Sequence, residues 1–514
     1  MAETWRHDRR SPQMTARAYT VAFEGVDARP VEVQCAVSNG LPNFAIVGLP
    51  SKAVAEAKER VRSALTALSI ALPSKRITVN LSPADLPKEG SHFDLPIALA
   101  LLAAIGILPP EEVEGTVALG ELSLDGGLVP VLGALPAAMA AAGEGRRLLC
   151  PEGCAPEAAL VDAAQVTGAR RLSEVIGHYT EASPLPPARV ARIEEARGGP
   201  DLRDVRGQER AKRALEVAAA GRHHLLMIGP PGSGKSMLAA RLPGLLPPMS
   251  AVETLETSMI HSLSGLIEEG RISRTRPFRE PHHTASMAAV VGGGKGARPG
   301  EISIAHNGVL FLDEIPEFPR PVLETLRTPI ETGEVTIARA NAHIRYPCRF
   351  LLVAAANPCR CGHLPDPARS CARAPGCAAD YMARISGPLM DRFDMRVEVP
   401  PVAFADLDLP PSGEGTAEVA ARVAAARGRQ SARFEGTDLR TNSDLSGDAL
   451  MEAARPDEEG MALLTKAAER LRLSARGYHR ILRVARTIAD LDGSEGVRRP
   501  HVAEAAGYRV TGGA

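Results

Sequence analysis

A glycine-rich segment that ends in lysine and serine carries the clearest chemistry in this sequence. Residues 229–236 follow the pattern G-x-x-x-x-G-K-[ST], in which glycines let consecutive backbone N–H groups turn toward a phosphate. Lys235 is predicted to reach the β- and γ-phosphates of a nucleotide, and the Ser236 hydroxyl to bind Mg²⁺. The apolar run 223–228 and the amphipathic run 237–246 favour this strand–loop–helix interpretation over a chance glycine-rich loop. The predicted nucleotide-binding residues of this segment are Gly229, Pro230, Pro231, Gly232, Ser233, Gly234, Lys235 and Ser236.

An apolar run that ends in two carboxylates supplies the second part of the predicted site. Residues 309–312 are followed directly by Asp313 and Glu314. Carboxylates at the carboxyl end of a buried strand can hold Mg²⁺ near the phosphates, so Asp313 is the predicted metal partner. Glu314 is the predicted general base that polarises the attacking water. The pair gains its specificity from the glycine-rich segment upstream.

Three further polar residues are candidates for catalysis. A third apolar run, 350–356, ends at Asn357, whose amide is placed either to orient water beside the γ-phosphate or only to cap the strand before Pro358. Arg392 and Arg476 are candidates for stabilising the charge on the transferring phosphoryl group. An isolated arginine is more often a surface residue, so these two depend on the resemblance described below.

Four cysteines are packed into one short segment. They follow the spacing C-x-C-x9-C-x5-C within an insert at 358–378. Four thiolates can close a tetrahedral structural Zn²⁺ site, and such a metal would order a short polar segment that has little core of its own. Free cytosolic thiols are the alternative, and His363 is a further candidate ligand. The predicted metal ligands are Cys359, Cys361, Cys371 and Cys377.

Length and composition indicate a multidomain protein with aliphatic cores. The chain has 514 residues, of which 45% are hydrophobic, 24% charged and only 3% aromatic, and this length corresponds to about three domains. The formal net charge of −1 neither favours nor excludes nucleic acid as a partner. No apolar signal core follows Met1, and the longest apolar run, 97–108, is short of the roughly 20 residues that span a bilayer. We expect a cytoplasmic protein without a membrane partner, and Met14 is an alternative start.

Hydrophobic patterning divides the chain into two α/β regions and a helical end. A Pro- and Gly-rich stretch separates the α/β regions, and a second one precedes the helical end. The predicted strands of the first region are 19–23, 31–37, 77–80 and 116–120, its predicted helices are 51–68 and 95–108, and the C-terminal helices are 416–433, 459–473 and 478–491.

Several long motifs closely resemble the ComM/YifB-type, magnesium-chelatase-like AAA+ ATPases of bacteria. They are the runs 276–294, 299–320, 357–362 and 474–491, and similarity extends from about residue 16 to residue 509. The resemblance implies an α/β multidomain fold. Its expected parts are a Lon-protease-like α+β domain of the ribosomal S5 domain 2 type at 14–180, a linker at 181–200, an AAA+ P-loop module with a parallel sheet at 201–401, and a helical lid at 402–510.

The same resemblance implies an ATP- and Mg²⁺-dependent ring hexamer that moves on DNA. Such a motor drives branch migration during homologous recombination of imported DNA. Asn357 would act as sensor 1, and Arg476, rather than Arg480, as the lid sensor for the same subunit's nucleotide. Arg392 would reach the nucleotide of a neighbouring subunit as an arginine finger.

The first region tests whether a Lon-type peptidase survives, since such enzymes need a Ser–Lys dyad. The position that resembles the Lon serine is His92, with Ser91 adjacent to it. The segment that resembles the lysine-bearing part, 126–141, contains no lysine. A catalytically dead scaffold is therefore expected.

Two basic segments are candidates for DNA contact. Residues 334–346 predict a β-hairpin that carries Arg339 and Arg345, and a glycine-rich loop carries Lys295 and Arg298. These cations either bind phosphates in a salt-sensitive, sequence-independent way or are only solvated.

Two adjacent histidines have a weaker claim to metal binding. His282 and His283 lie near Glu280, but in an extended segment they are expected to point to opposite faces. A structural or DNA-facing role is favoured for them over a metal site.

Two other functions compete with the DNA motor. A magnesium-chelatase motor subunit, or another ATP-driven remodelling factor, would share the whole ATP site. The first α/β region and the four-cysteine insert favour the DNA motor, because chelatase motor subunits resemble only the AAA+ part. An ATP-gated peptidase is the third possibility, and the missing dyad argues against it.

Overall fold

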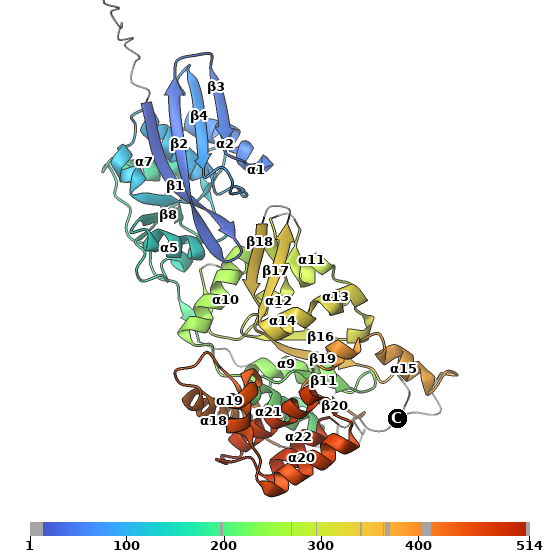
Figure 1. Ribbon diagram of the computed structural model, residues 1–514. Helices are drawn as coiled ribbons and strands as arrows, with labels where there is room; N and C mark the ends of the chain where they lie inside the picture. Colours follow the sequence, from blue (N-terminus) through green and yellow to red (C-terminus); the bar gives the residue numbers. More distant parts are fainter. Residues whose placement is uncertain are drawn as a thin grey trace, which may run out of the picture.

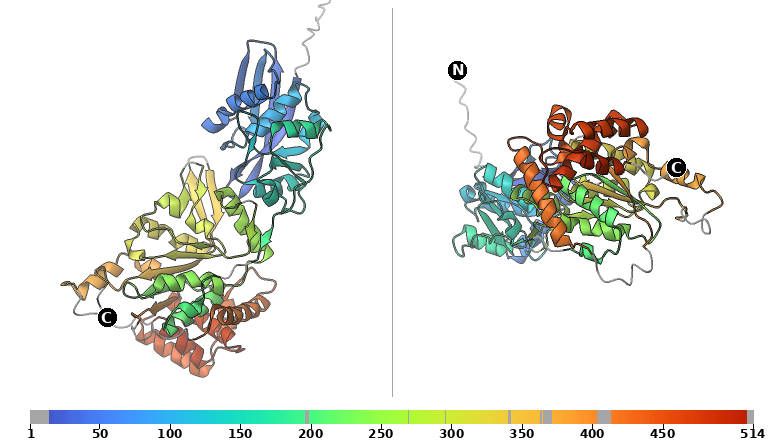
Figure 2. Two further views of the ribbon diagram at one scale, coloured as in Figure 1. Left: turned by 180° about the vertical axis from the view of Figure 1, so that it is seen from behind. Right: turned by 90° about the horizontal axis from the view of Figure 1, so that it is seen from below.

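The computed structural model describes residues 14–195, 199–268, 270–294, 296–339, 342–362, 364, 371–402 and 413–509. Within these ranges the molecule is elongated, with an N-terminal mixed sheet at one end, a parallel sheet in the middle and helices at the other end (Figure 1). The same order is seen from behind in Figure 2. The predictions for Lys295, His363 and the side chain of Arg339 fall outside the described part.

The N-terminal region is built on a seven-stranded mixed sheet in the order β3-β4-β2-β1-β5-β8-β9. The long strands β1 and β2 form an antiparallel pair, and the β1–β5–β8–β9 half is parallel. The strands are β1 (Met14–Glu24), β2 (Asp27–Ser38), β3 (Asn43–Val47), β4 (Arg76–Ser82), β5 (Thr116–Ala118), β8 (Arg147–Pro151) and β9 (Val166–Ala169), with a separate small pair, β6 (Glu121–Leu122) and β7 (Leu128–Val129). The helices are α1 (Lys52–Ala55), α2 (Ala57–Ala67), α3 (Asp94–Ala104), α4 (Pro110–Glu114), α5 (Ala134–Gly143), α6 (Ala155–Ala158) and α7 (Leu172–Tyr179).

Helix α3 is the centre of this region because it is apolar on every side and all of its residues are buried. Its single acidic residue, Asp94, is fully buried and accepts from the Arg60 guanidinium at 2.6 and 2.9 Å and from the Leu122 backbone N–H at 3.1 Å. A buried carboxylate needs such partners to offset its desolvation. The ion pair therefore fixes α2 against the start of α3.

Two predicted helices end differently from expectation. The predicted helix 51–68 is divided at Glu56, which ends α1 and precedes α2. The predicted helix 95–108 ends at Ala104 because Gly106 adopts a left-handed backbone (φ 77°). Periodicity alone cannot show where a chain breaks inside or just after an apolar run.

The central region is a five-stranded parallel sheet in the order β13-β16-β19-β11-β20. Its strands are β13 (Phe278–Arg279), β16 (Val309–Leu312), β19 (Leu351–Ala356), β11 (Leu225–Ile228) and β20 (Met395–Glu398). The helices around it are α8 (Glu209–Gly221), α9 (Lys235–Leu245), α10 (Ala251–Ser264), α11 (Met287–Val290), α12 (Glu301–Ile304), α13 (Arg320–Thr325), α14 (Arg327–Thr332), α15 (Gly376–Met382) and α16 (Gly387–Met390).

Alternate residues of the sheet enter two different cores. Val309 and Phe311 of β16 belong to the core shared with α8, α9 and the C-terminal helices. Leu310 and Leu312 belong to a second core with α13 and the hairpin formed by β17 (Glu334–Arg339) and β18 (Ala342–Pro347). A strand that is buried on both faces reads as a continuous apolar run, which is why β11, β16 and β19 were predictable.

The C-terminal helices pack on one face of the parallel sheet through α8. Helices α18 and α21 both contact α8, and residues of all three share one core. Helix α18 matches its prediction, while α20 and α21 begin one and three residues earlier than expected. The five helices are α18 (Thr416–Arg433), α19 (Gly447–Ala454), α20 (Glu458–Arg470), α21 (Ala475–Leu491) and α22 (Arg499–Gly507).

The N-terminal and central regions are joined by more than the connecting chain. Strand β10 (Ile193–Glu194), in the segment predicted as a linker, pairs with β12 (Ile272–Ser273). Helix α10 contacts α5, and Ser262 Oγ donates to the buried Glu157 at 3.0 Å. The contact therefore includes a buried polar group as well as a backbone pairing.

The predicted hairpin is present as β17 (Glu334–Arg339) and β18 (Ala342–Pro347), an antiparallel pair. It points toward the N-terminal region (Figure 1). The β1–β2 turn meets it, since Gly25 lies against the Arg345 carbonyl and Val26 packs on the second core. Among the described residues, no helix combines the length and apolar character that crossing a membrane requires.

Candidate active site

The carboxyl ends of three neighbouring parallel strands bring the predicted nucleotide residues together. The P-loop follows β11, Asp313 follows β16 and Asn357 follows β19. Because β16, β19 and β11 are adjacent and parallel, these three segments meet at one edge of the sheet. Ligands of open parallel sheets bind at this edge.

Glycine is needed at three positions of the P-loop for two different structural reasons. Gly232 and Gly234 adopt left-handed backbone conformations with φ of 75° and 90°. Gly229 has no room for a side chain, because a Cβ there would lie 2.1 Å from the Val399 carbonyl oxygen. The loop is thus shaped by its backbone and leads directly into α9, whose N-terminus favours an anion.

Lys235 is held at the centre of this edge. Its ammonium donates to the carbonyl oxygens of Gly229 and Pro230 at 2.8 and 2.9 Å and to Asn357 Oδ1 at 3.3 Å. Burial lowers the pKa of Lys235, and the carboxylates of Asp313 and Glu314 oppose that shift. The lysine is therefore preorganised by neutral oxygens that a phosphate can replace.

Ser236 and Asp313 form a matched pair of oxygen donors. Ser236 Oγ donates to Asp313 Oδ2 at 2.8 Å, and the Glu314 N–H donates to Asp313 Oδ1 at 2.9 Å. Glu314 itself has a left-handed backbone (φ 48°), which is uncommon for a residue other than glycine. A hydroxyl and a carboxylate side by side are hard oxygen ligands that fit Mg²⁺.

Glu280 belongs to this edge and was not predicted as a site residue. It follows β13, the strand next to β16, and partial desolvation together with the charge of Asp313 raises the pKa of Glu280. The signal that could have found it is its position after a strand, but β13 has only two residues. Gln208 was also missed, although its side-chain amide donates to the Ser233 and Pro400 carbonyls at the P-loop.

The predicted arginines Arg392 and Arg476 lie near enough for their charges to act on one another. Arg392 is only 5% exposed and pairs with Glu331 at 2.5 Å. Burial lowers the pKa of Arg392, and the charges of Arg476 and Arg480 lower it further. The expectation that Arg476 serves its own subunit's nucleotide and Arg392 that of a neighbouring subunit stays a prediction.

Arg480 and Arg476 differ in exposure. Arg480 is buried and lies 3.4 Å from Asp394, which also accepts from the His224 backbone N–H. Arg476, in the first turn of α21, is exposed. Only Arg476 of this pair is free to reach a ligand outside the subunit.

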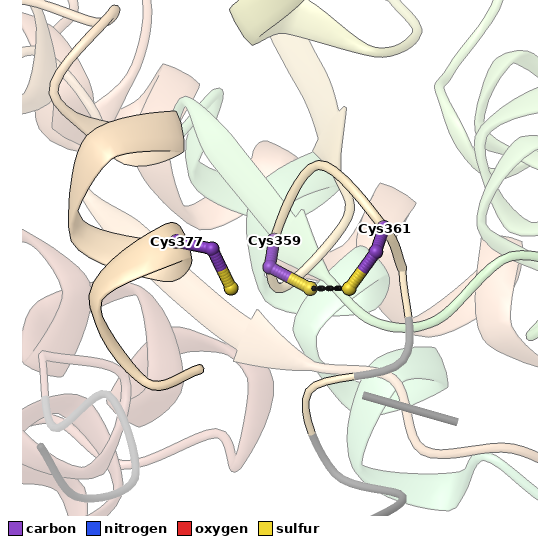
Figure 3. Close-up of side chains that lie close together, drawn as sticks. All are labelled: Cys359, Cys361 and Cys377. Carbon is purple, nitrogen blue, oxygen red and sulfur yellow. Dashed lines mark hydrogen bonds between the residues drawn. The ribbon is translucent and has the colours of Figure 1, made fainter. Parts of the chain in front are cut away.

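Three of the four predicted cysteine ligands gather at one point. The sulfur atoms of Cys359, Cys361 and Cys377 lie within 4.8 Å of one another, and those of Cys359 and Cys361 are 3.1 Å apart (Figure 3). Cys371 is not in this trio, but its thiol is hydrogen-bonded to Cys377 and raises the pKa of Cys377 to about 12. A metal ion would reverse that shift, since it binds thiolates.

The cysteine segment rests on the P-loop. Gly362 has a left-handed backbone (φ 81°), and a Cβ there would lie 2.7 Å from the Pro231 ring. Cys359 follows Asn357 by two residues. The trio is therefore placed to fix both the P-loop and Asn357.

The two basic segments predicted for DNA contact lie side by side. The Gly292–Gly293/Arg298–Pro299 pair, β14 and β15, packs on the hairpin, where Tyr346 Oη donates to the Ala297 carbonyl at 3.0 Å. Arg298 and Arg345 are both exposed.

The expectation for the histidine pair was wrong in its geometry. The rings of His282 and His283 are 4.2 Å apart and do not point to opposite faces. The chain turns at this point, with His282 Nδ1 bonded to Thr284 Oγ1 at 2.7 Å. No metal-binding group that includes them was found among the described residues.

Comparison with known proteins covers all three regions. Residues 201–407 match the family "Magnesium chelatase, subunit ChlI", residues 31–153 match "Subunit ChlI of Mg-chelatase", and residues 413–509 match "Magnesium chelatase, subunit ChlI C-terminal". The similarity to this family therefore includes the N-terminal region, the central region with the nucleotide site and the C-terminal helices.

Some relatives match this chain over almost its whole length, and others match only part of it. The chain is 45% identical over 501 residues to competence protein ComM of Haemophilus influenzae, covering 96% of this chain and 97% of that protein. It is 44% identical over 498 residues to protein YifB of Escherichia coli K12, covering 96% of each. The magnesium-chelatase 38 kDa subunit of Rhodobacter capsulatus is 30% identical over 192 residues, which cover 33% of this chain and 55% of that protein.

Proposed function

The chain belongs to the ComM/YifB-type family of magnesium-chelatase-like AAA+ proteins, and from this premise we propose that it is an ATP-driven hexameric DNA motor. Its proposed action is branch migration during homologous recombination of imported DNA. Family membership supports ATP hydrolysis, and the DNA substrate rests on the basic hairpin and loop described above.

The proposed hydrolysis assigns one role to each group at the carboxyl edge of the sheet. Lys235 exchanges its carbonyl partners for phosphate oxygens, and Ser236 with Asp313 holds Mg²⁺, which neutralises phosphate charge. Glu314 accepts a proton from the attacking water, and Asn357 orients that water. Glu280, close to Asp313, adds a second carboxylate on the metal side.

The proposed ring completes each site from a neighbour. Arg392 is held by Glu331 in the single chain, and Arg476 is exposed in the first turn of α21. We assign Arg392 to the nucleotide of the next subunit, where it would stabilise the charge on the transferring phosphoryl group, and Arg476 to the lid-sensor role that the resemblance implies. Release of Arg392 from Glu331 would accompany assembly.

The single observation that carries the DNA proposal is the connection between hairpin and nucleotide site. Strand β18 ends at Pro347, and β19 begins at Leu351 and leads to Asn357. The exposed Arg345 thus stands at one end of a short stretch of chain that leads to Asn357 at the other, and the exposed Arg298 lies in the loop packed on the hairpin. A change at Asn357 on hydrolysis can move the hairpin, and phosphate contacts at the hairpin would move DNA.

A structural Zn²⁺ is part of the proposal. Zn–S bonds of about 2.3 Å place thiolates about 3.8 Å apart, a spacing between the 3.1 Å that separates Cys359 from Cys361 and the 4.8 Å within which all three sulfur atoms lie. Cys371, next to Cys377, is the fourth proposed ligand. The metal would hold Gly362 against the P-loop.

We also propose that the N-terminal region is a Lon-like fold without peptidase activity. His92 occupies the expected serine position, and it is buried with a ring nitrogen 2.9 Å from the Val21 carbonyl oxygen. Lys88, the lysine nearest in sequence, is buried and donates to the Pro83 carbonyl. Both side chains are used to hold the fold.

The DNA proposal is tested by the ATPase rate of the full chain with no DNA, single-stranded DNA and a branched junction. We expect DNA to stimulate hydrolysis several-fold, and the double variant Arg298→Gln/Arg345→Gln to lose most of that stimulation. Lys235→Ala is the blank, and Lys466→Gln/Arg470→Gln on the exposed face of α20 is the control matched in charge.

An ATPase rate that does not respond to any DNA would contradict the motor proposal and favour a chelatase-like or other remodelling function. Stimulation that survives loss of both arginines would keep the motor and reject the hairpin as its DNA contact. Peptide cleavage by the wild type that Ser91→Ala abolishes would overturn the scaffold assignment.

A further inference from the structure

An open cavity lies at the opposite edge of the same parallel sheet. It measures about 620 Å³ and is lined by the amino ends of the strands, the segment before α10, the start of α10, helix α18 and the loop at 439–441. Arg222 precedes β11 by three residues, Gly308 directly precedes β16 and Arg349 precedes β19 by two. The three strands that end at the nucleotide site therefore begin at this cavity.

Arginine dominates the lining. Glu253 is the only carboxylate among the lining residues, whereas six arginines line the cavity: Arg222, Arg274, Arg276, Arg349, Arg427 and Arg440. Asp444 and Glu256 stand behind the wall and pair with Arg222 and Arg440 at 3.3 and 3.2 Å. The cavity interior thus keeps an excess of positive charge.

Part of this arginine set is committed to the fold. Arg276 donates to both oxygens of Glu253 at 3.1 and 3.0 Å and to the carbonyls of Pro247 and Asn307, each at 2.7 Å. Its hydrogen bonds join α10 to the start of β16. Arg276 therefore has a complete structural explanation.

Apart from Arg440, which donates to Glu256, the remaining guanidinium groups lack a complete set of hydrogen-bond and ion-pair partners. In the part of the chain that the structure describes, no carboxylate lies within ion-pair distance of Arg349 or Arg427. Arg427 donates only to the Ala219 carbonyl, and the buried Arg222 Nε has no hydrogen-bond partner there. Arg274 reaches the Met249 carbonyl at 3.0 Å and Glu195 only at 3.9 Å.

Crowding these cations costs stability. Burial lowers the pKa of Arg222 and of Arg427, and the charges of neighbouring arginines lower both further. A protein gains nothing by holding unpaired guanidinium groups together in partial burial unless an anion is bound among them. Guanidinium forks match phosphate oxygens in pairs, and a cavity of this size is in the range of small-ligand sites.

We propose that this cavity is a second anion site, separate from the P-loop, that binds a small molecule carrying a chain of phosphate groups. Arg349 and Arg427 contact the phosphates, Arg222 and Arg440 complete the charge, and Arg276 with Glu253 forms the fixed wall. Because Arg349 follows the hairpin end Pro347 by two residues, the bound anion sits at the base of the β17–β18 hairpin. The ligand is either an inorganic polyphosphate or the phosphate chain of a nucleotide, which share this chemistry.

The test uses the full chain carrying Lys235→Ala, so that the P-loop is disabled, and titrates it calorimetrically with sodium tripolyphosphate at fixed ionic strength. We expect one molecule to bind per chain, and Arg349→Gln/Arg427→Gln in the same background to weaken binding by at least about tenfold. Lys466→Gln/Arg470→Gln, which removes two exposed charges from α20, is the charge-matched control and should bind as the parent does. Absence of binding to the Lys235→Ala chain, or equal binding by the double variant, would overturn the site.

Separate titrations with ATP and with single-stranded DNA distinguish the sources. Tighter binding of ATP than of tripolyphosphate assigns a nucleotide, and equal binding assigns the inorganic chain. A chain that binds single-stranded DNA but does not bind tripolyphosphate would reject a small-molecule site.

Thermal unfolding without ligand separates a binding role from a structural one. Arg349→Gln should unfold at the same or a higher temperature than its parent, because like-charge repulsion is relieved, and tripolyphosphate should no longer raise that temperature. Should the double variant not fold, Arg349→Lys keeps the charge and loses the fork, and weaker binding is expected. A lower unfolding temperature together with unchanged affinity would make Arg349 a structural residue and overturn the proposal.

Discussion

The two edges of the central parallel sheet hold positive charge in different ways. At the carboxyl edge a single lysine, Lys235, stands among carbonyl, amide and carboxylate oxygens, and the charges of Asp313 and Glu314 support it. At the amino edge six arginines surround a cavity that has one carboxylate in its lining, Glu253. Both edges belong to the same strands, so the difference comes from the loops and helices that surround each edge.

The difference indicates how each edge can bind a phosphate group. Lys235 can exchange its neutral oxygen partners for phosphate oxygens at little cost in free energy. A Mg²⁺ ion held by Ser236 and Asp313 would neutralise further phosphate charge. At the amino edge the one carboxylate of the cavity lining, Glu253, already accepts hydrogen bonds from Arg276 with both oxygens. The amino edge would therefore bind phosphate without a metal, by arginine forks alone.

The largest expected effect breaks the carboxyl edge. Lys235→Ala should lower the ATP hydrolysis rate about 10³-fold, about 4 kcal/mol of barrier, because its ammonium is the preorganised cation beside the γ-phosphate. Steady-state phosphate release measures this, and Lys466→Ala on the exposed face of α20 is the control. A variant that keeps a tenth of the wild-type rate would show that Lys235 is not the central cation.

The contrast between edges also explains what the sequence could predict. The carboxyl edge was predictable because its groups are contiguous or follow apolar runs that are buried on both faces, as with Asp313 after β16 and Asn357 after β19. The mixed α/β character and the helical C-terminal region followed from the same patterns, whereas the parallel sheet was implied by the family resemblance. Glu280 escaped because a two-residue strand leaves no periodic signal.

The amino edge could not be predicted. Its arginines come from segments spread between Arg222 and Arg440, each of which reads as an isolated surface cation. Only the folding of α18 onto α8 brings Arg427 to the strand ends. The clustering of Arg476 with Arg392 was missed for the same reason, since proximity across 84 positions leaves no local pattern.

The next effect concerns helix α10, which carries Glu253 at the amino edge and Ser262 against Glu157 at its other end. Burial raises the pKa of Glu157 from 4.5 to about 7, so the folded state holds this proton more tightly than the unfolded chain. The resulting stability is complete below about pH 4.5 and is lost as pH rises through 7, up to about 3 kcal/mol.

Glu157→Gln should remove that pH dependence. Relative to the wild type, the variant should gain free energy of unfolding between pH 5 and pH 8, measured by urea denaturation at each pH. Glu24→Gln, an exposed carboxyl at the end of β1, is the control that should track the wild type. Parallel curves for wild type and Glu157→Gln would contradict a neutral Glu157 in the folded protein.

A smaller effect tests the cysteine segment at the carboxyl edge. Cys377→Ser should abolish stoichiometric zinc and lower ATP hydrolysis about tenfold, because Gly362 and Asn357 would lose their fixed position. Metal analysis of the purified protein measures the first, and Cys348→Ser, a buried cysteine outside the trio, should retain its zinc. Full activity of the metal-free variant would separate the cysteines from the nucleotide site.

The smallest effect isolates charge from packing at the amino edge. Arg440 pairs with Glu256 at 3.2 Å, and the side chains are 39% and 34% exposed, so solvent screens the pair and its loss should change the free energy of unfolding by less than about 1 kcal/mol. Glu256 also keeps its bonds from His306 and Asn307. Arg440→Gln should nevertheless weaken tripolyphosphate binding about threefold, because one charge of the cavity is removed. A large loss of stability with unaltered binding would mean that the amino edge uses its arginines as the rest of the fold does, and the contrast between the two edges would disappear.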